Sequence, residues 1–131
     1  MAVALYLKGD KQTINYTCTG AVAVDEIRVF GSTDGAAGVL GVAQTAGVTG
    51  DVIAYAITGA YQFSVVTGAA IAQGEGVNYL PASGKVDDTA STPGAGGLSD
   101  FGVAMTAKAA GSSPTTIDVI LTPGAGTYDA A

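Results

Sequence analysis

The sequence predicts a small all-β single domain, a β-barrel or a β-sandwich, with little helix. Runs in which apolar and polar residues alternate recur along the chain, and glycines separate these runs. No segment keeps a helical period beyond roughly two turns. The length of 131 residues is that of one domain.

The chain begins with a short hydrophobic arm. Two sets of apolar side chains alternate along it, Val3, Leu5 and Leu7 with Ala2, Ala4 and Tyr6. A charged turn at residues 8–11 ends the run. We therefore expect an arm over residues 1–10, a β domain over 11–123 and a C-terminal tail over 124–131.

The strands of the β domain follow from their residue patterns. Over residues 13–19, Ile14, Tyr16 and Cys18 face one way, and this period of two predicts a half-buried strand. Cys18 is expected to be a small buried residue. Similar patterns, rich in β-branched and aromatic residues, predict further strands at 22–24 with 27–30, 39–45, 52–57, 61–66, 77–80, 85–86, 101–106 and 115–122.

The connections are predicted from turn residues. Thr58-Gly59-Ala60 is expected to join its two flanking strands as a hairpin. Residues 69–73 have room for one helical turn. Residues 87–99 contain almost no large apolar side chain, so we expect a mobile surface loop there.

One sequence motif occurs twice, in Leu40–Ala46 and in Phe101–Ala107. Both copies contain Gly-Val-Ala-x-Thr-Ala, and after a turn each is followed by Asp-Val-Ile. Since the motif carries no functional group beyond a threonine, we interpret it as scaffold. It predicts two pseudo-repeated strand-turn-strand units within one domain.

Composition excludes several functions. A net charge of -6 and scattered basic residues argue against nucleic-acid binding. No apolar run is long enough for a membrane span. The absence of histidine removes the common nucleophile pairs and most zinc and copper sites, so we expect no enzyme, no cofactor and no metal. Asp87, Asp88 and Ser91 offer at most a weak calcium site, and solvated surface is the stronger interpretation.

The arm allows two interpretations. It is either an ordinary first strand of the domain or a strand that pairs with the sheet edge of another chain. In the second case backbone hydrogen bonds supply affinity and alternate side chains supply specificity.

The order of these features resembles that of the small capsid decoration proteins of tailed bacteriophages, also called cement or head-stabilising proteins. The resemblance covers nearly the whole chain and rests on a series of short segments in order: Tyr6–Asp10, Ala21–Glu26, Leu40–Ala43, Gly59–Phe63, Gly74–Tyr79 and Phe101–Ala104.

The resemblance implies a virion structural protein without catalytic activity. Such a protein is made in the bacterial cytoplasm, binds the outer surface of the capsid and stabilises the expanded shell by bridging major capsid protein subunits. A homotrimer is favoured over a dimer. By position, the arm that contacts the shell would consist of Ala2, Val3, Ala4, Leu5, Tyr6 and Leu7.

Two alternatives stay open at this point. The first is a small-molecule or carbohydrate-binding β-barrel that uses Tyr55, Tyr61 or Tyr79 at the mouth of a pocket. The second is another surface or tail component of a virion.

Overall fold

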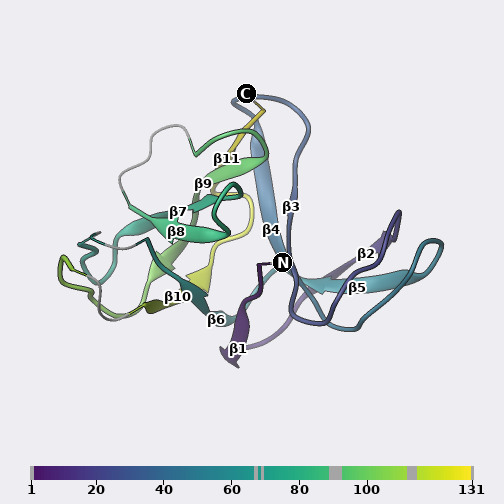
Figure 1. Ribbon diagram of the computed structural model, residues 1–131, viewed down its shortest axis with the longest axis horizontal. Coiled ribbons are helices and arrows are strands. Elements are labelled where there is room, and N and C mark those ends of the chain that lie inside the picture. Colours follow the sequence, from purple (N-terminus) through teal and green to yellow (C-terminus); the bar gives the residue numbers. More distant parts are fainter. Residues whose placement is uncertain (1, 67, 69, 89–92, 112–114, 131) are drawn as a thin grey trace.

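The computed structural model describes residues 2–66, 68, 70–88, 93–111 and 115–130. These residues form an antiparallel sheet that curls into a half-barrel, and they contain no helix (Figure 1). The predicted all-β class is therefore confirmed. None of the described residues belongs to a helix with the length and apolarity that a membrane crossing requires. The strands are β1 (Leu5–Lys8), β2 (Thr13–Thr17), β3 (Ile27–Phe30), β4 (Ala37–Ala43), β5 (Val52–Ala56), β6 (Ala60–Ser64), β7 (Gly76–Leu80), β8 (Lys85–Asp87), β9 (Gly97–Ala104), β10 (Thr116–Leu121) and β11 (Gly126–Asp129).

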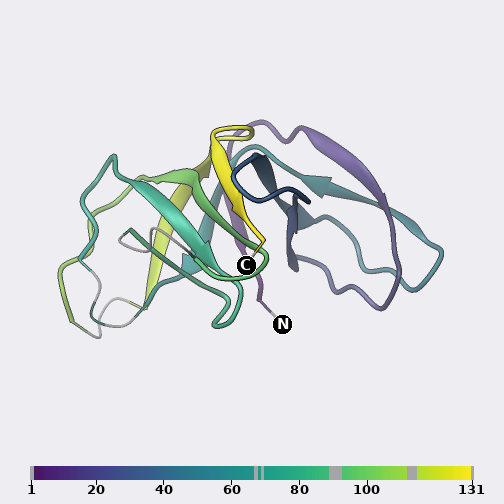
Figure 2. The same cartoon turned by 90° about the horizontal axis from the view of Figure 1, so that it is seen from above.

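The sheet is built from two halves with the same strand order. In the first half the order is β2-β5-β4-β3, and in the second it is β6-β10-β9-β7. If the four strands of each half are counted in chain order, both halves have the spatial order first, fourth, third, second. β8 is an addition to the second half, where it pairs with the outer edge of β7. Figure 2 shows the halves as two lobes of one arch.

The register of the strands confirms that the halves are equivalent. Ile27 pairs with Val42 in the first half, and Gly76 pairs with Val103 in the second. Val42 and Val103 occupy the same position in the twice-used motif. The predicted pair of strand-turn-strand units is present as β4–β5 and β9–β10, and the repeat is larger than the motif because it includes β3 and β7.

A β-bulge introduces the second strand of each half. The Asp25 amide donates to the Ala43 carbonyl at 2.8 Å, and the Ala43 amide donates to Glu26. In the second half the Gly74 amide donates to the Ala104 carbonyl, and the Ala104 amide donates to the Glu75 carbonyl. Asp25 (φ 69°) and Gly74 (φ 88°) both adopt the left-handed conformation that such a bulge requires.

The repeated glycine permits close packing. A Cβ on Gly102 would lie 2.5 Å from Val119 Cγ1 and 2.7 Å from the Ile120 carbonyl oxygen. A Cβ on Gly41 would lie 3.0 Å from Tyr55 Cβ. A side chain at Gly102 would therefore push β9 and β10 apart, and one at Gly41 would force the Phe30 and Tyr55 side chains to shift.

The C-terminal residues differ from the sequence prediction. Residues 124–131 were expected to be a tail, but residues 126–129 form β11, which lies between the two halves. Thr127 pairs with Ala37 on β4 and with Ser99 on β9. β11 thereby joins the two lobes of the arch.

Three predicted connections also differ. The expected hairpin at residues 58–60 is wrong, because β5 pairs with β2 and β4 whereas β6 pairs with β1 and β10. The expected loop over 87–99 ends early, since β9 begins at Gly97 and Leu98 is fully buried; its residues 89–92 lie outside the described part of the chain. The described residues of the segment 69–73 form no helical turn, and residue 69 is outside the description.

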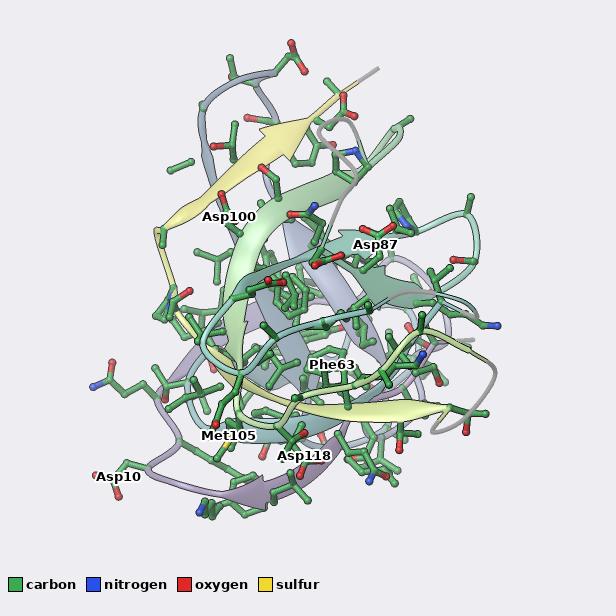
Figure 3. The ribbon with its side chains drawn as sticks, turned by 90° about the vertical axis from the view of Figure 1, so that its left-hand side faces the viewer. Asp10, Phe63, Asp87, Asp100, Met105 and Asp118 are labelled. Atoms are coloured by element: carbon green, nitrogen blue, oxygen red, sulfur yellow. The ribbon has the colours of Figure 1, made fainter. Side chains whose placement is uncertain are left out.

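Two hydrophobic clusters stabilise the molecule. The larger cluster fills the second half and also receives Ile27, Leu40, Val42 and Ala56 from the first. Phe63 lies inside it, within the curl of the second half (Figure 3). The smaller cluster belongs to the first half alone and consists of Cys18, Val22, Ala43, Ile53 and Tyr55, with Ile14, Tyr16 and Phe30 packed against it. Cys18 is buried as predicted.

Candidate functional site

The N-terminal arm is anchored to the domain by its small residues. The Ile27 amide donates to the Ala2 carbonyl at 2.9 Å, and the Ala4 amide donates to the Asp25 carbonyl at 3.0 Å. Ala4 is fully buried in the larger cluster. These contacts place residues 2–4 against the beginning of β3.

The large residues of the arm point outward. Val3, Leu5, Tyr6 and Leu7 are 37%, 50%, 42% and 43% exposed. Among the described residues eight large apolar side chains are exposed, and these four are half of them. β1 is an edge strand, since it pairs with β6 on one side and with no described strand on the other. The arm therefore combines exposed apolar side chains with a free backbone edge.

A further exposed residue extends this surface. On β6, Gln62 pairs with Leu5 of β1 on one side and with Asp118 of β10 on the other. Side chains that lie opposite each other, or two residues apart, share a face of the sheet. Ile120, which is 44% exposed, therefore lies on the same outer face as Leu5. The sequence had not indicated Ile120, because only the strand pairing brings it near the arm.

Tyr6 is held in a fixed orientation. Its hydroxyl donates to the Gly9 carbonyl at 2.6 Å, and its ring packs edge-on against Tyr61 with centroids 5.5 Å apart. The Lys11 Nζ atom lies 3.9 Å from the centre of the Tyr6 ring, a cation–π contact. A side chain that is already ordered loses less entropy when a partner covers it.

A cleft of about 590 Å³ lies where the arm meets the second half. Ala2, Val3 and Glu26 line one side, and Tyr79 and the turn at 81–85 line the other. Burial raises the pKa of Tyr79, and the Glu26 carboxylate adds to this effect. Because these residues come from three distant parts of the chain, no local sequence pattern could have indicated the cleft.

The tyrosines proposed for a ligand pocket are mostly inaccessible. Tyr55 and Tyr61 are fully buried, and their hydroxyls have no hydrogen-bond partner among the described residues. Burial also raises the pKa of Tyr61 to about 12. Only Tyr79, at 6% exposed, reaches the cleft. Tyr55 and Tyr61 therefore present no ring face on which a sugar could stack.

Two acidic side chains, Glu75 and Asp88, interact with each other. A hydrogen bond with Glu75 raises the pKa of the Asp88 carboxyl, and burial adds to the effect. In the described part of the chain, no group of three or more acidic, histidine or cysteine residues is arranged to hold a metal ion. Ser91, considered with Asp87 and Asp88 for calcium, lies outside the described residues.

Comparison with known proteins adds one finding to this geometry. A family model described as phage cement protein matches residues 8–121. No curated protein and no solved structure matches the chain. The matched range covers both halves of the sheet and begins at the end of β1.

Proposed function

Because the chain belongs to the phage cement protein family, we propose that it binds the outer surface of a phage capsid and bridges neighbouring major capsid protein subunits. Cement proteins stabilise the capsid, and the form that this protein stabilises is the expanded shell. The protein acts by binding and has no catalytic step. It is made in the host bacterial cytoplasm and joins the virion from outside.

The observation that carries this proposal is the cluster of exposed apolar residues on the arm. Covering the exposed half of Leu5 or Leu7 contributes roughly 1 kcal/mol each, because full burial of a leucine contributes about 1.5–3 kcal/mol. Such a contact is weak by itself. A symmetric oligomer presents several arms at once, and this avidity raises the apparent affinity by orders of magnitude without a new contact. We therefore propose a homotrimer in preference to a dimer.

Because part of the arm is buried, substitutions test its role better than a deletion does. Deleting residues 2–7 would remove the buried Ala4 and all but one residue of β1, so a loss of binding could reflect a damaged fold. The double variant Leu5→Ser, Leu7→Ser changes only exposed side chains. Val48→Ser is the matched control, since Val48 is 62% exposed and lies in a turn far from the arm in sequence.

The experiment measures occupancy on expanded capsids that lack the cement protein. We expect at least a tenfold weaker apparent affinity for the Leu5→Ser, Leu7→Ser variant and an unchanged affinity for Val48→Ser. Native mass spectrometry should show the same oligomer for both variants and the unmodified protein. If the arm variant decorates capsids as fully as the unmodified protein, the arm is not the contact. If the unmodified protein does not bind capsids at all, the proposed function is wrong.

A further inference from the structure

The duplication of the fold shows which strand is missing from the first half. In the second half, β8 pairs with the outer edge of β7 through Asn78↔Asp87, Tyr79↔Val86 and Leu80↔Lys85. Since Gly76 is equivalent to Ile27, the edge that β8 covers is equivalent to residues 29–31. No described strand of the first half lies in the position of β8.

The arm covers only the beginning of this edge. It pairs with β3 up to Ile27, whose amide donates to the Ala2 carbonyl. Backbone directions alternate along a strand, so the N–H and C=O groups of Val29 point to the same side as those of Ile27. Beyond Ile27, β3 pairs only with β4 in the described chain. Val29 thus presents a donor and an acceptor at an open edge.

The side chains next to this edge lack the cover that β8 gives in the second half. Val86 is fully buried opposite Tyr79, which is only 6% exposed. Phe30 is equivalent to Tyr79, yet it is only half-buried, as is the Tyr16 ring that packs against it at 5.8 Å. The Arg28 guanidinium carbon lies 3.9 Å from the centre of the Tyr16 ring and 5.7 Å from that of Phe30, so a charged side chain rather than a β-strand covers this rim of the smaller cluster.

We infer that the outer edge of β3 accepts an extended segment of the major capsid protein as an additional antiparallel strand. The segment bonds to the backbone of Val29 and places an apolar side chain opposite Phe30, as β8 places Val86 opposite Tyr79. This inference rests on the proposed function. The capsid is the favoured partner because the arm proposed to contact it lies against β3 up to Ile27, directly beside this edge. A strand added to an open edge is a common way to bind an extended peptide.

The test uses proline to remove the donor from the edge. Val29→Pro deletes the outward N–H but leaves the ladder with β4, which the neighbouring residues make. Asn15→Pro is the matched control. It removes an outward N–H from β2, the other outer strand of the first half, because β2 bonds to β5 through its alternate residues, such as Gln12 and Cys18. We expect at least a tenfold weaker apparent affinity for capsids with Val29→Pro and an unchanged affinity with Asn15→Pro.

Hydrogen exchange of the unmodified protein gives an independent measurement if Val29→Pro folds poorly. We expect the Val29 amide, which points away from β4, to exchange at least tenfold more slowly on decorated capsids than in the free oligomer. Unchanged exchange in capsid-bound protein would overturn the inference while leaving the proposed function intact. Protection that rises with protein concentration in the absence of capsids would also overturn it, because a second copy would then be the partner. Absence of capsid binding by the unmodified protein would instead refute the proposed function.

Discussion

Gly74 and Asp25 occupy equivalent backbone positions in the two halves, and both adopt the left-handed conformation. The two residue types differ in the conformational strain that this imposes. Gly74 has φ 88°, and no atom lies within 4 Å of the place that a Cβ would take, so a side chain there meets strain but no clash. We expect Gly74→Ala to lower the free energy of unfolding by about 1–2 kcal/mol. Gly74→Asn should cost less, because asparagine and aspartate tolerate this conformation and the first half uses Asp25.

Thermal or urea unfolding measures this difference. Gly20→Ala is the control, since Gly20 has an ordinary φ and open space around it. It should leave stability unchanged or raise it by about 0.4–1 kcal/mol. Equal losses for the alanine variants of Gly74 and Gly20 would show that the bulge conformation has no energetic role.

Asp88 predicts a dependence of stability on pH. The hydrogen bond with Glu75 raises the folded-state pKa of Asp88 above its ordinary value of 3.8. A raised carboxyl pKa means that the folded state holds the proton more strongly than the unfolded state does. Its contribution to stability is therefore present at low pH and is lost as the pH rises above 3.8 and through the folded-state pKa.

Asp88→Asn removes this titration while keeping the size of the side chain. We expect the melting temperature of Asp88→Asn, relative to the unmodified protein, to increase as the pH is raised from about 3.5 to 7. The comparison cancels other groups that titrate in the same range. Parallel melting profiles for the two proteins would contradict the prediction.

At the scale of elements, β11 shows how one short strand can join two halves. The Tyr128 ring on β11 lies against Gly31, where any Cβ would overlap the ring atoms, and Tyr128 Cβ would be 3.4 Å from a Cβ on Gly38. Tyr128 also packs on the larger cluster. The C-terminal strand therefore depends on two small residues of the first half.

A double-mutant cycle tests this contact. Gly31→Ala should cost about 1–3 kcal/mol, because it pushes the ring away. Tyr128→Ala should also destabilise, by roughly 2 kcal/mol, since a half-buried aromatic ring is lost. In the Tyr128→Ala background, Gly31→Ala should cost almost nothing because the clash is gone. Additive costs in urea unfolding would show that Gly31 and Tyr128 act separately.

The elements that the sequence predicted well are those whose pattern is local. Strands β2 and β10 alternate clearly, and the two motif copies fall on β4 and β9. The hairpin at 58–60 failed because β5 and β6 belong to different halves, and their partners are distant in sequence. β11 was missed because turn residues at 123–124 indicated an end, whereas two neighbouring strands provide the ladder that orders it.

The candidate site was predictable only in part. Alternation in the arm distinguished Ala4 from Leu5 and Leu7, but it placed Tyr6 with the alanines. Tyr6 is 42% exposed because it lies on an edge strand that is exposed along its whole length, and its hydroxyl bonds to the Gly9 carbonyl. The open edge of β3 has no sequence signal at all, because it is defined by the strand that the first half lacks.

At the scale of the whole molecule, the two clusters predict how the halves unfold. Leu40 belongs to the first half by sequence, yet it is buried in the larger cluster with side chains of the second. Ile53 is buried in the smaller cluster, which contains first-half residues only. Removing either side chain leaves a cavity and should cost about 2–5 kcal/mol. The two substitutions should nevertheless destabilise different parts of the chain.

Hydrogen exchange under native conditions distinguishes them. Leu40→Ala should speed amide exchange in both halves, in β6 and β10 as well as in β4 and β5, because the shared cluster couples their opening. Ile53→Ala, the matched control, should speed exchange mainly in β2 and β5. If the effect of Leu40→Ala stayed within residues 13–56, the halves would open independently despite their common core. A coupled core would suit the proposed bridging of capsid subunits, since tension applied to one lobe of the arch is then resisted by the packing of both.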